Sequence, residues 1–133
     1  MENIEELEVK MVKDERGRVV WPFNFLSGAD FSLNNIHIPS LKPGAVRGNH
    51  YHKYSTEYIF IMSGPCRACF QDNITGEKAD FLILDESPKC FKIGPEITHA
   101  FKNESDKEII LFCYEQRSED GPDETGLHRI VIL

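Results

Sequence analysis

Histidine and carboxylate side chains suited to metal binding are concentrated in one part of the chain. His50 and His52 are two residues apart, Glu57 follows five residues later, and His99 lies farther along in a β-prone segment. Side chains two positions apart on a β-strand face the same side, so both early histidines can reach one ion. Three imidazoles and one carboxylate suit a divalent transition metal, with Zn, Mn, Fe and Ni left open. The alternative interpretation is four polar side chains that are hydrogen-bonded separately inside a crowded fold.

Short β-strands between turn residues are the elements that must position these ligands. No stretch shows a sustained helical period, whereas β-branched and aromatic residues recur in short segments. The predicted strands span Ile4–Met11, Arg18–Phe23, Phe31–Ile38, Glu57–Met62, Cys66–Gln71, Ala79–Leu84, Cys90–Ile93, Ile97–Phe101, Glu108–Glu115 and Leu127–Ile132. Turns are predicted at Asp14–Gly17, Gly64–Pro65 and Asp72–Gly76. This series predicts an all-β sandwich or barrel, in which inward side chains of several strands converge.

Two glycines frame the first three predicted ligands at fixed spacing. Five residues separate Gly44 from His50, four separate His52 from Glu57, and six separate Glu57 from Gly64. This pattern resembles the first motif of the cupin superfamily, position for position.

A second motif surrounds the fourth predicted ligand. His99 is followed four residues later by Asn103, as in the second cupin motif. The second motif departs from the cupin pattern before the histidine. Gly94 stands where the pattern has a proline, and Glu96 stands where it has a glycine. The opening glycine of the motif falls on Pro88. The departures concern the shape of the backbone turn more than the metal ligand.

The cupin resemblance covers roughly residues 35–115 and implies a specific fold. That fold is a double-stranded β-helix, a small jelly-roll barrel with the metal inside, and a single cupin domain is expected over residues 1–133. By matching of motif positions, the implied metal ligands are His50, His52, Glu57 and His99.

The segment Val46–Lys53 carries a closer resemblance. It is similar to the cupin domain at the end of capsular-polysaccharide enzymes that act on nucleotide-linked keto sugars. The turn at Asp14–Gly17 and the strand Arg18–Phe23 also resemble the start of cupin-fold sugar-nucleotide epimerases and ketoisomerases. The resemblance implies a small-molecule partner such as a nucleotide sugar, and a metal-assisted proton shift next to a carbonyl. Arg47 is a candidate for binding a phosphate or sugar oxygen, with a surface salt bridge as the equal alternative.

The proton-transferring residue is left open. Candidates by chemistry alone are Tyr51, Tyr54, Tyr58, Tyr114 and His37. Tyr51 and Tyr58 are expected to point away from the ligands, and His37 is interpreted as a strand residue outside the motifs. Two other functions use the same ligands: a non-haem iron dioxygenase, and a non-enzymatic cupin that binds a small ligand.

Composition limits the partners of the chain. The 133 residues carry 15 basic and 22 acidic side chains, a net charge of −7, which disfavours nucleic acid. The longest apolar run, residues 109–114, is far too short to cross a membrane. Residues 1–6 lack the basic start and apolar core of a secretion signal, so a cytoplasmic location with reduced cysteines is expected.

The outward side of one predicted strand suggests an interface. If Glu57 points inward, then Tyr58, Phe60 and Met62 point outward and form a bulky apolar face. A homodimer would cover it, and the alternative is another strand of the same chain.

Overall fold

Every regular element in the described part of the chain is a β-strand. The computed structural model describes residues 1–133 except 2, 16, 22–35, 118–126 and 129–133. The strands are β1 (Ile4–Leu7), β2 (Lys10–Asp14), β3 (Gly17–Trp21), β4 (Ile36–His37), β5 (Ser40–Leu41), β6 (Val46–Tyr51), β7 (Ser55–Ile61), β8 (Cys66–Asp72), β9 (Lys78–Ile83), β10 (Lys89–Ile93), β11 (Ile97–Asn103), β12 (Ile109–Arg117) and β13 (Leu127–His128). The all-β prediction is confirmed. None of the described segments is a helix able to cross a lipid bilayer.

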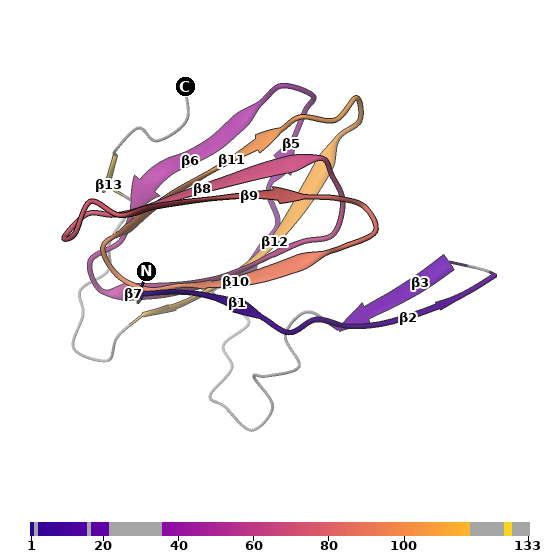
Figure 1. Ribbon diagram of the computed structural model, residues 1–133, viewed down its shortest axis with the longest axis horizontal. Helices are drawn as coiled ribbons and strands as arrows, with labels where there is room; N and C mark the ends of the chain where they lie inside the picture. The colour runs from indigo at the N-terminus through magenta and orange to yellow at the C-terminus, as the bar shows by residue number, and fades with distance from the viewer. Residues whose placement is uncertain (2, 16, 22–35, 118–126, 129–133) are drawn as a thin grey trace.

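Two antiparallel sheets face each other and enclose the interior (Figure 1). One sheet has the order β1-β10-β7-β12-β4, with β5 also pairing with β12, and the other has the order β13-β6-β11-β8-β9. From β5 to β13 the chain passes back and forth between the sheets, except that β8 and β9 are neighbours in one sheet. This is a jelly-roll arrangement, and the barrel has the expected cupin fold. Strands β2 and β3 form a separate hairpin that extends away from the barrel (Figure 1), joined by the turn predicted from Asp14–Gly17.

The core lies between the two sheets and follows the twofold alternation of the strands. Along β8, Cys66, Ala68 and Phe70 are buried, while the residues between them are half-buried. This places Cys66 and Cys69 on opposite sides of the strand. All four cysteines are free thiols. Burial raises the pKa of Cys66 and of Cys90 to about 12, so both stay protonated at neutral pH.

The outward face of β7 is buried within the single chain. Tyr58 and Phe60 are 7% and 2% exposed, and their rings lie beside Tyr114 and Phe112 of β12. The chain itself therefore covers these two side chains, in line with the alternative to an interface. The homodimer stays a prediction.

The described strands differ from the predicted ones at a few boundaries. Residues 4–11 form two strands rather than one, because the chain leaves the sheet of β1 before it enters the hairpin. Strand β4 falls within the predicted strand Phe31–Ile38, whereas β5 and β6 had no prediction. Residues 22–23, 31–35 and 129–132 of three predicted strands lie outside the described residues, and a single domain over residues 1–133 remains a prediction.

Candidate metal centre

A bulge in β6 brings the first predicted ligand next to the last one. His99 pairs with His50, but the next residue, Ala100, pairs with Gly48, so Asn49 is an extra residue in β6. Gly48 has a φ of 101°, and a Cβ there would lie 2.6 Å from the carbonyl oxygen of His99. Only glycine permits so close an approach of the two backbones.

The two early histidines lie at the end of β6. We predicted that His50 and His52 face one side because they are two residues apart on a strand. In the structure β6 ends at Tyr51, and His52 lies just beyond it in the connection to β7. The bulge at Asn49 precedes both histidines, so it sets His50 beside His99 and leaves the spacing of the two early histidines unchanged.

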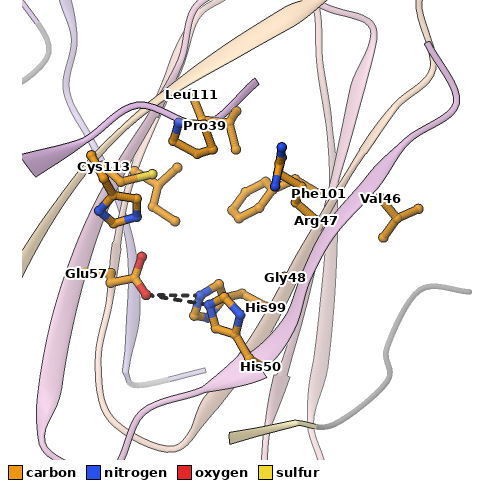
Figure 2. Close-up of a pocket in the computed structure, with 12 residues that line it drawn as sticks. Pro39, Val46, Arg47, Gly48, His50, Glu57, His99, Phe101, Leu111 and Cys113 are labelled. Atoms are coloured by element: carbon orange, nitrogen blue, oxygen red, sulfur yellow. Dashed lines mark ion pairs between the residues drawn. The ribbon is translucent and has the colours of Figure 1, made fainter. Parts of the chain in front are cut away.

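Glu57 is the point on which all three histidines converge. It lies near the start of β7 and is 4% exposed. Its Oε1 atom is 2.7 Å from Nε2 of His52, 3.4 Å from Nε2 of His99 and 3.8 Å from Nε2 of His50. Figure 2 shows two of these ion pairs meeting at one carboxylate oxygen.

The pKa of Glu57 lies well below its usual range. Burial by itself would raise that pKa, but the side chains of His50, His52 and His99 around the carboxylate lower it by more. The carboxylate is therefore ionised at neutral pH, in an interior where an unpaired negative charge would be costly. Outside the cluster, Glu115 lies 4.0 Å from Nδ1 of His52, where it can help to orient that ring.

The position of the proton on His99 shows that a cation fits this cluster. Nδ1 of His99 is 3.0 Å from the carbonyl oxygen of Ile97, which only accepts hydrogen bonds, so Nδ1 carries the proton. In the neutral ring, Nε2 then has a lone pair, faces the Glu57 carboxylate and is buried without a hydrogen-bond partner in the described part of the chain. Two electron-rich atoms 3.4 Å apart favour a positive ion between them.

The four predicted ligands form one donor cluster. The ligand atoms of His50, His52, Glu57 and His99 all lie within 4.8 Å of one another. Three imidazole nitrogens and one carboxylate oxygen suit a divalent transition metal, so these side chains fit the predicted cofactor.

A cavity of about 390 Å³ opens beside the cluster and is lined by His50, Glu57 and His99. Arg47, the predicted substrate-binding residue, lines the same cavity. Its Nε donates a hydrogen bond of 2.5 Å to the carbonyl oxygen of Ser40, which holds the guanidinium at the edge of the cavity. A small molecule in the cavity would contact both the cluster and this cation.

His37 is a cavity residue that the sequence interpretation set aside. It lies on β4, pairs with Cys113 of β12 and lines the cavity with it. The cavity is not lined by the four tyrosines that were candidates by chemistry: Tyr51, Tyr54, Tyr58 and Tyr114. The position of His37 depends on pairing with a strand more than 70 residues away, which local patterns do not reveal.

The turn before β11 supports the cluster through its backbone. The N–H of Glu96 donates a hydrogen bond of 2.8 Å to the carbonyl oxygen of His52. Glu96 has a φ of 65°, a left-handed conformation that favours glycine, and it occupies the position where the cupin motif has one. Glu96 therefore replaces the glycine of the motif but keeps the left-handed backbone conformation of the turn.

Asn103, the last residue of the second motif, is structural. Its Nδ2 donates to the carbonyl oxygens of Leu41 and Lys107, and its Oδ1 accepts from the N–H of Ser105. These bonds close the loop after β11 and tie it to β5. Gly64, the last residue of the first motif, has no room for a Cβ, which would lie 1.9 Å from the carbonyl oxygen of Ile83.

Known proteins resemble this chain in sequence and in fold. The family described as "Polysaccharide biosynthesis C-terminal domain" matches residues 12–124. A curated relative from Pseudomonas aeruginosa, named UDP-2-acetamido-2,6-beta-L-arabino-hexul-4-ose reductase, is 28% identical over 118 residues, which are 87% of this chain. The chain spans 30% of the length of that relative.

Two solved structures share the fold at low sequence identity. NovW, a 4-keto-6-deoxy sugar epimerase from Streptomyces spheroides, is 20% identical with a TM-score of 0.73, covering 90% of this chain and 66% of its own. A dTDP sugar isomerase from Desulfovibrio desulfuricans G20 is 16% identical with a TM-score of 0.75, covering 89% of this chain and 79% of its own.

Proposed function

Because this chain belongs to the polysaccharide biosynthesis C-terminal domain family, we propose that it epimerises or isomerises a nucleotide-linked keto sugar with the help of a divalent transition metal. The observation that carries the proposal is the buried cluster at the wall of an open cavity. It combines an ionised carboxylate with a histidine nitrogen that has no hydrogen-bond partner among the residues that the structure describes.

In this proposal the four clustered side chains hold the metal. Glu57 supplies the anionic oxygen, and the Nδ1–H bond of His99 to Ile97 keeps its Nε2 available as a ligand. A bound metal would act as a Lewis acid that polarises a carbonyl group and so favours loss of a proton from the neighbouring carbon. His50, which is 33% exposed on its side chain, is the histidine of the cluster most open to the cavity.

The substrate class follows from the cavity and from the relatives. Arg47 offers a planar cation that suits phosphate or sugar oxygens, although the chain as a whole carries a charge of −7. The names of the curated relative and of NovW both describe sugars with a keto group at carbon 4. The relative is named as a reductase, but that name belongs to a protein of which this chain matches less than a third. We therefore propose that this chain acts on a nucleotide-linked 4-keto sugar, and we do not propose that it reduces the sugar.

Solvent exchange tests the reaction directly. Purified protein, with its metal content measured, is incubated in D₂O with UDP- or dTDP-linked 4-keto-6-deoxy hexoses, and NMR follows the carbons next to the carbonyl. We expect deuterium to appear at one of these carbons faster than in buffer. Glu57→Gln should reduce both metal content and exchange by about a hundredfold or more, because it removes the anionic ligand. The matched control is Glu86→Gln, an exposed carboxylate distant in sequence from the cluster, which should leave both unchanged.

The same assay separates the other functions that these ligands allow. Metal-loaded protein that binds the nucleotide sugar but exchanges no proton would contradict the proposal and favour a binding protein. Turnover that requires iron and consumes O₂ would instead favour a dioxygenase. A chain that takes up none of Zn²⁺, Mn²⁺, Fe²⁺ or Ni²⁺ would refute the metal part of the proposal.

A further inference from the structure

A second group of possible metal ligands lies on the wall of the cavity. His37 of β4, Glu57 of β7 and Cys113 of β12 offer one nitrogen, one oxygen and one sulfur within 4.8 Å of one another. Strand β12 pairs with both β4 and β7, so the three side chains come from adjacent strands of one sheet. All three line the cavity.

Glu57 is common to this group and to the histidine cluster, and its two oxygens allow it to serve both. The three histidines of the first cluster all approach the same oxygen, Oε1. Figure 2 shows the other carboxylate oxygen directed toward the side where Cys113 lies. A carboxylate with one oxygen on each side can bridge two cations.

We propose that His37, Glu57 and Cys113 form a second metal site, selective for a thiophilic divalent ion such as Zn²⁺ or Cd²⁺. A thiolate, an imidazole and a carboxylate are a common donor set for zinc, and the sulfur favours soft metals over Mn²⁺ or Mg²⁺. Binding displaces the thiol proton of Cys113, which leaves to solvent, so the new bond is between sulfur and metal. The open cavity provides access for the ion and room for water or a ligand atom as a further donor.

The accessibility of the three residues supports binding from the cavity side. Cys113 is 2% exposed and Glu57 is 4% exposed, whereas His37 is exposed. An ion arriving through the cavity would meet the histidine first and then the two buried donors. The proposed site differs from the histidine cluster in one chemical respect, because only this site contains sulfur.

The test uses this sulfur as a spectroscopic signal. Full-length chain freed of metal with a chelator is titrated with Cd²⁺, and the ultraviolet charge-transfer absorption of a Cd–thiolate bond is recorded with the bound stoichiometry. The background variant is Cys69→Ser, which removes the one cysteine that is not buried. We expect two Cd²⁺ ions per chain and a thiolate band, because the histidine cluster alone would give no such band.

Variants then identify the cysteine that produces the absorption band. Cys113→Ser should abolish it, His37→Ala should weaken the binding that produces it by roughly 10-fold or more, and Cys90→Ser should leave it intact. His37 is exposed, so its replacement is compatible with folding even if Cys113→Ser is not. A titration without a thiolate band, or a band that survives in His37→Ala at full affinity, would overturn the proposal. A single bound ion with a thiolate band would support this site and contradict metal binding by the histidine cluster. Failure of the exchange reaction with keto sugars would not affect this measurement.

Discussion

The interior of the barrel contains two adjacent regions with opposite energetics. Around Phe70 the rings of Phe81, Phe91 and Phe101 pack at centroid distances of 5.8, 5.1 and 6.1 Å, and their burial stabilises the fold directly. Around Glu57 the same two sheets enclose an ionised carboxylate and three histidines, which cost free energy unless their charges are balanced.

One strand connects the two regions and shows how little separates them. On β11, His99 belongs to the polar cluster and Phe101, two residues on, belongs to the aromatic core; their ring centroids are 6.2 Å apart. From this comparison we expect the apolar region to maintain the barrel by itself and the stability of the polar region to depend on a bound ion. Variants in the two regions should therefore respond differently to metal.

Loss of an aromatic side chain from the core should have the largest effect on stability. Phe70 is 1% exposed, so Phe70→Ala should lower the free energy of unfolding by about 3–5 kcal/mol, with or without metal. Denaturant unfolding of both forms measures this. Ile110→Ala, at a residue that is 45% exposed, is the control and should change stability by about 0.5 kcal/mol or less. A loss at Phe70 that metal repairs would contradict the separation of the two regions.

Removal of one cluster ligand should act only through the metal. At a metal concentration one hundred times its dissociation constant, the native chain should gain about 2.7 kcal/mol of stability. His99→Ala should lose most of this gain, because Nε2 of His99 is a buried nitrogen with no hydrogen-bond partner among the described residues. Thermal unfolding with and without added Zn²⁺ measures the difference. An equal gain in the variant would remove His99 from the ligand set.

Acid should weaken the polar region and leave the aromatic one unaffected. Glu57 has a lower pKa in the folded chain than its usual value of 4.5, so its ionised form stabilises the fold above that pH. This contribution is lost as the pH falls below 4.5 and passes through the folded pKa. Each unit by which the pKa differs between the unfolded and the folded chain corresponds to about 1.4 kcal/mol of stability. Unfolding of the metal-free chain, followed as the pH is lowered from about 6, should therefore show a loss of stability that is smaller in Glu57→Gln than in the native chain. Identical pH profiles would show that another carboxylate is responsible.

The two regions also differ in how far the sequence alone could describe them. The all-β fold, the turn at Asp14–Gly17 and the four clustered ligands follow from short-range patterns, and the structure brings those ligands together. The bulge at Gly48 and Asn49, which sets His50 beside His99, was not predicted, because it depends on contact with β11. His37 was named as a candidate by chemistry and then set aside, since only the pairing of β4 with β12 places it in the cavity. Patterns within one strand reveal periodicity, but register shifts and partners distant in sequence require the folded chain.

The smallest predicted effect concerns the turn that supports the polar region. Glu96 adopts a φ of 65°, which costs a residue with a Cβ roughly 1–2 kcal/mol, whereas glycine adopts it without strain. Glycine in turn loses more freedom on folding, at a cost of roughly 0.5–1 kcal/mol. Glu96→Gly should therefore raise the free energy of unfolding by about 0.5–1 kcal/mol, measured with urea on the metal-free chain. Glu86→Gly, at an exposed position outside the left-handed region, is the matched control and should lower stability instead. Metal affinity should not change, because the bond to His52 comes from the backbone N–H of residue 96, which glycine retains. A gain in stability accompanied by weaker metal binding would show that the Glu96 side chain, and not only its backbone, supports the cluster.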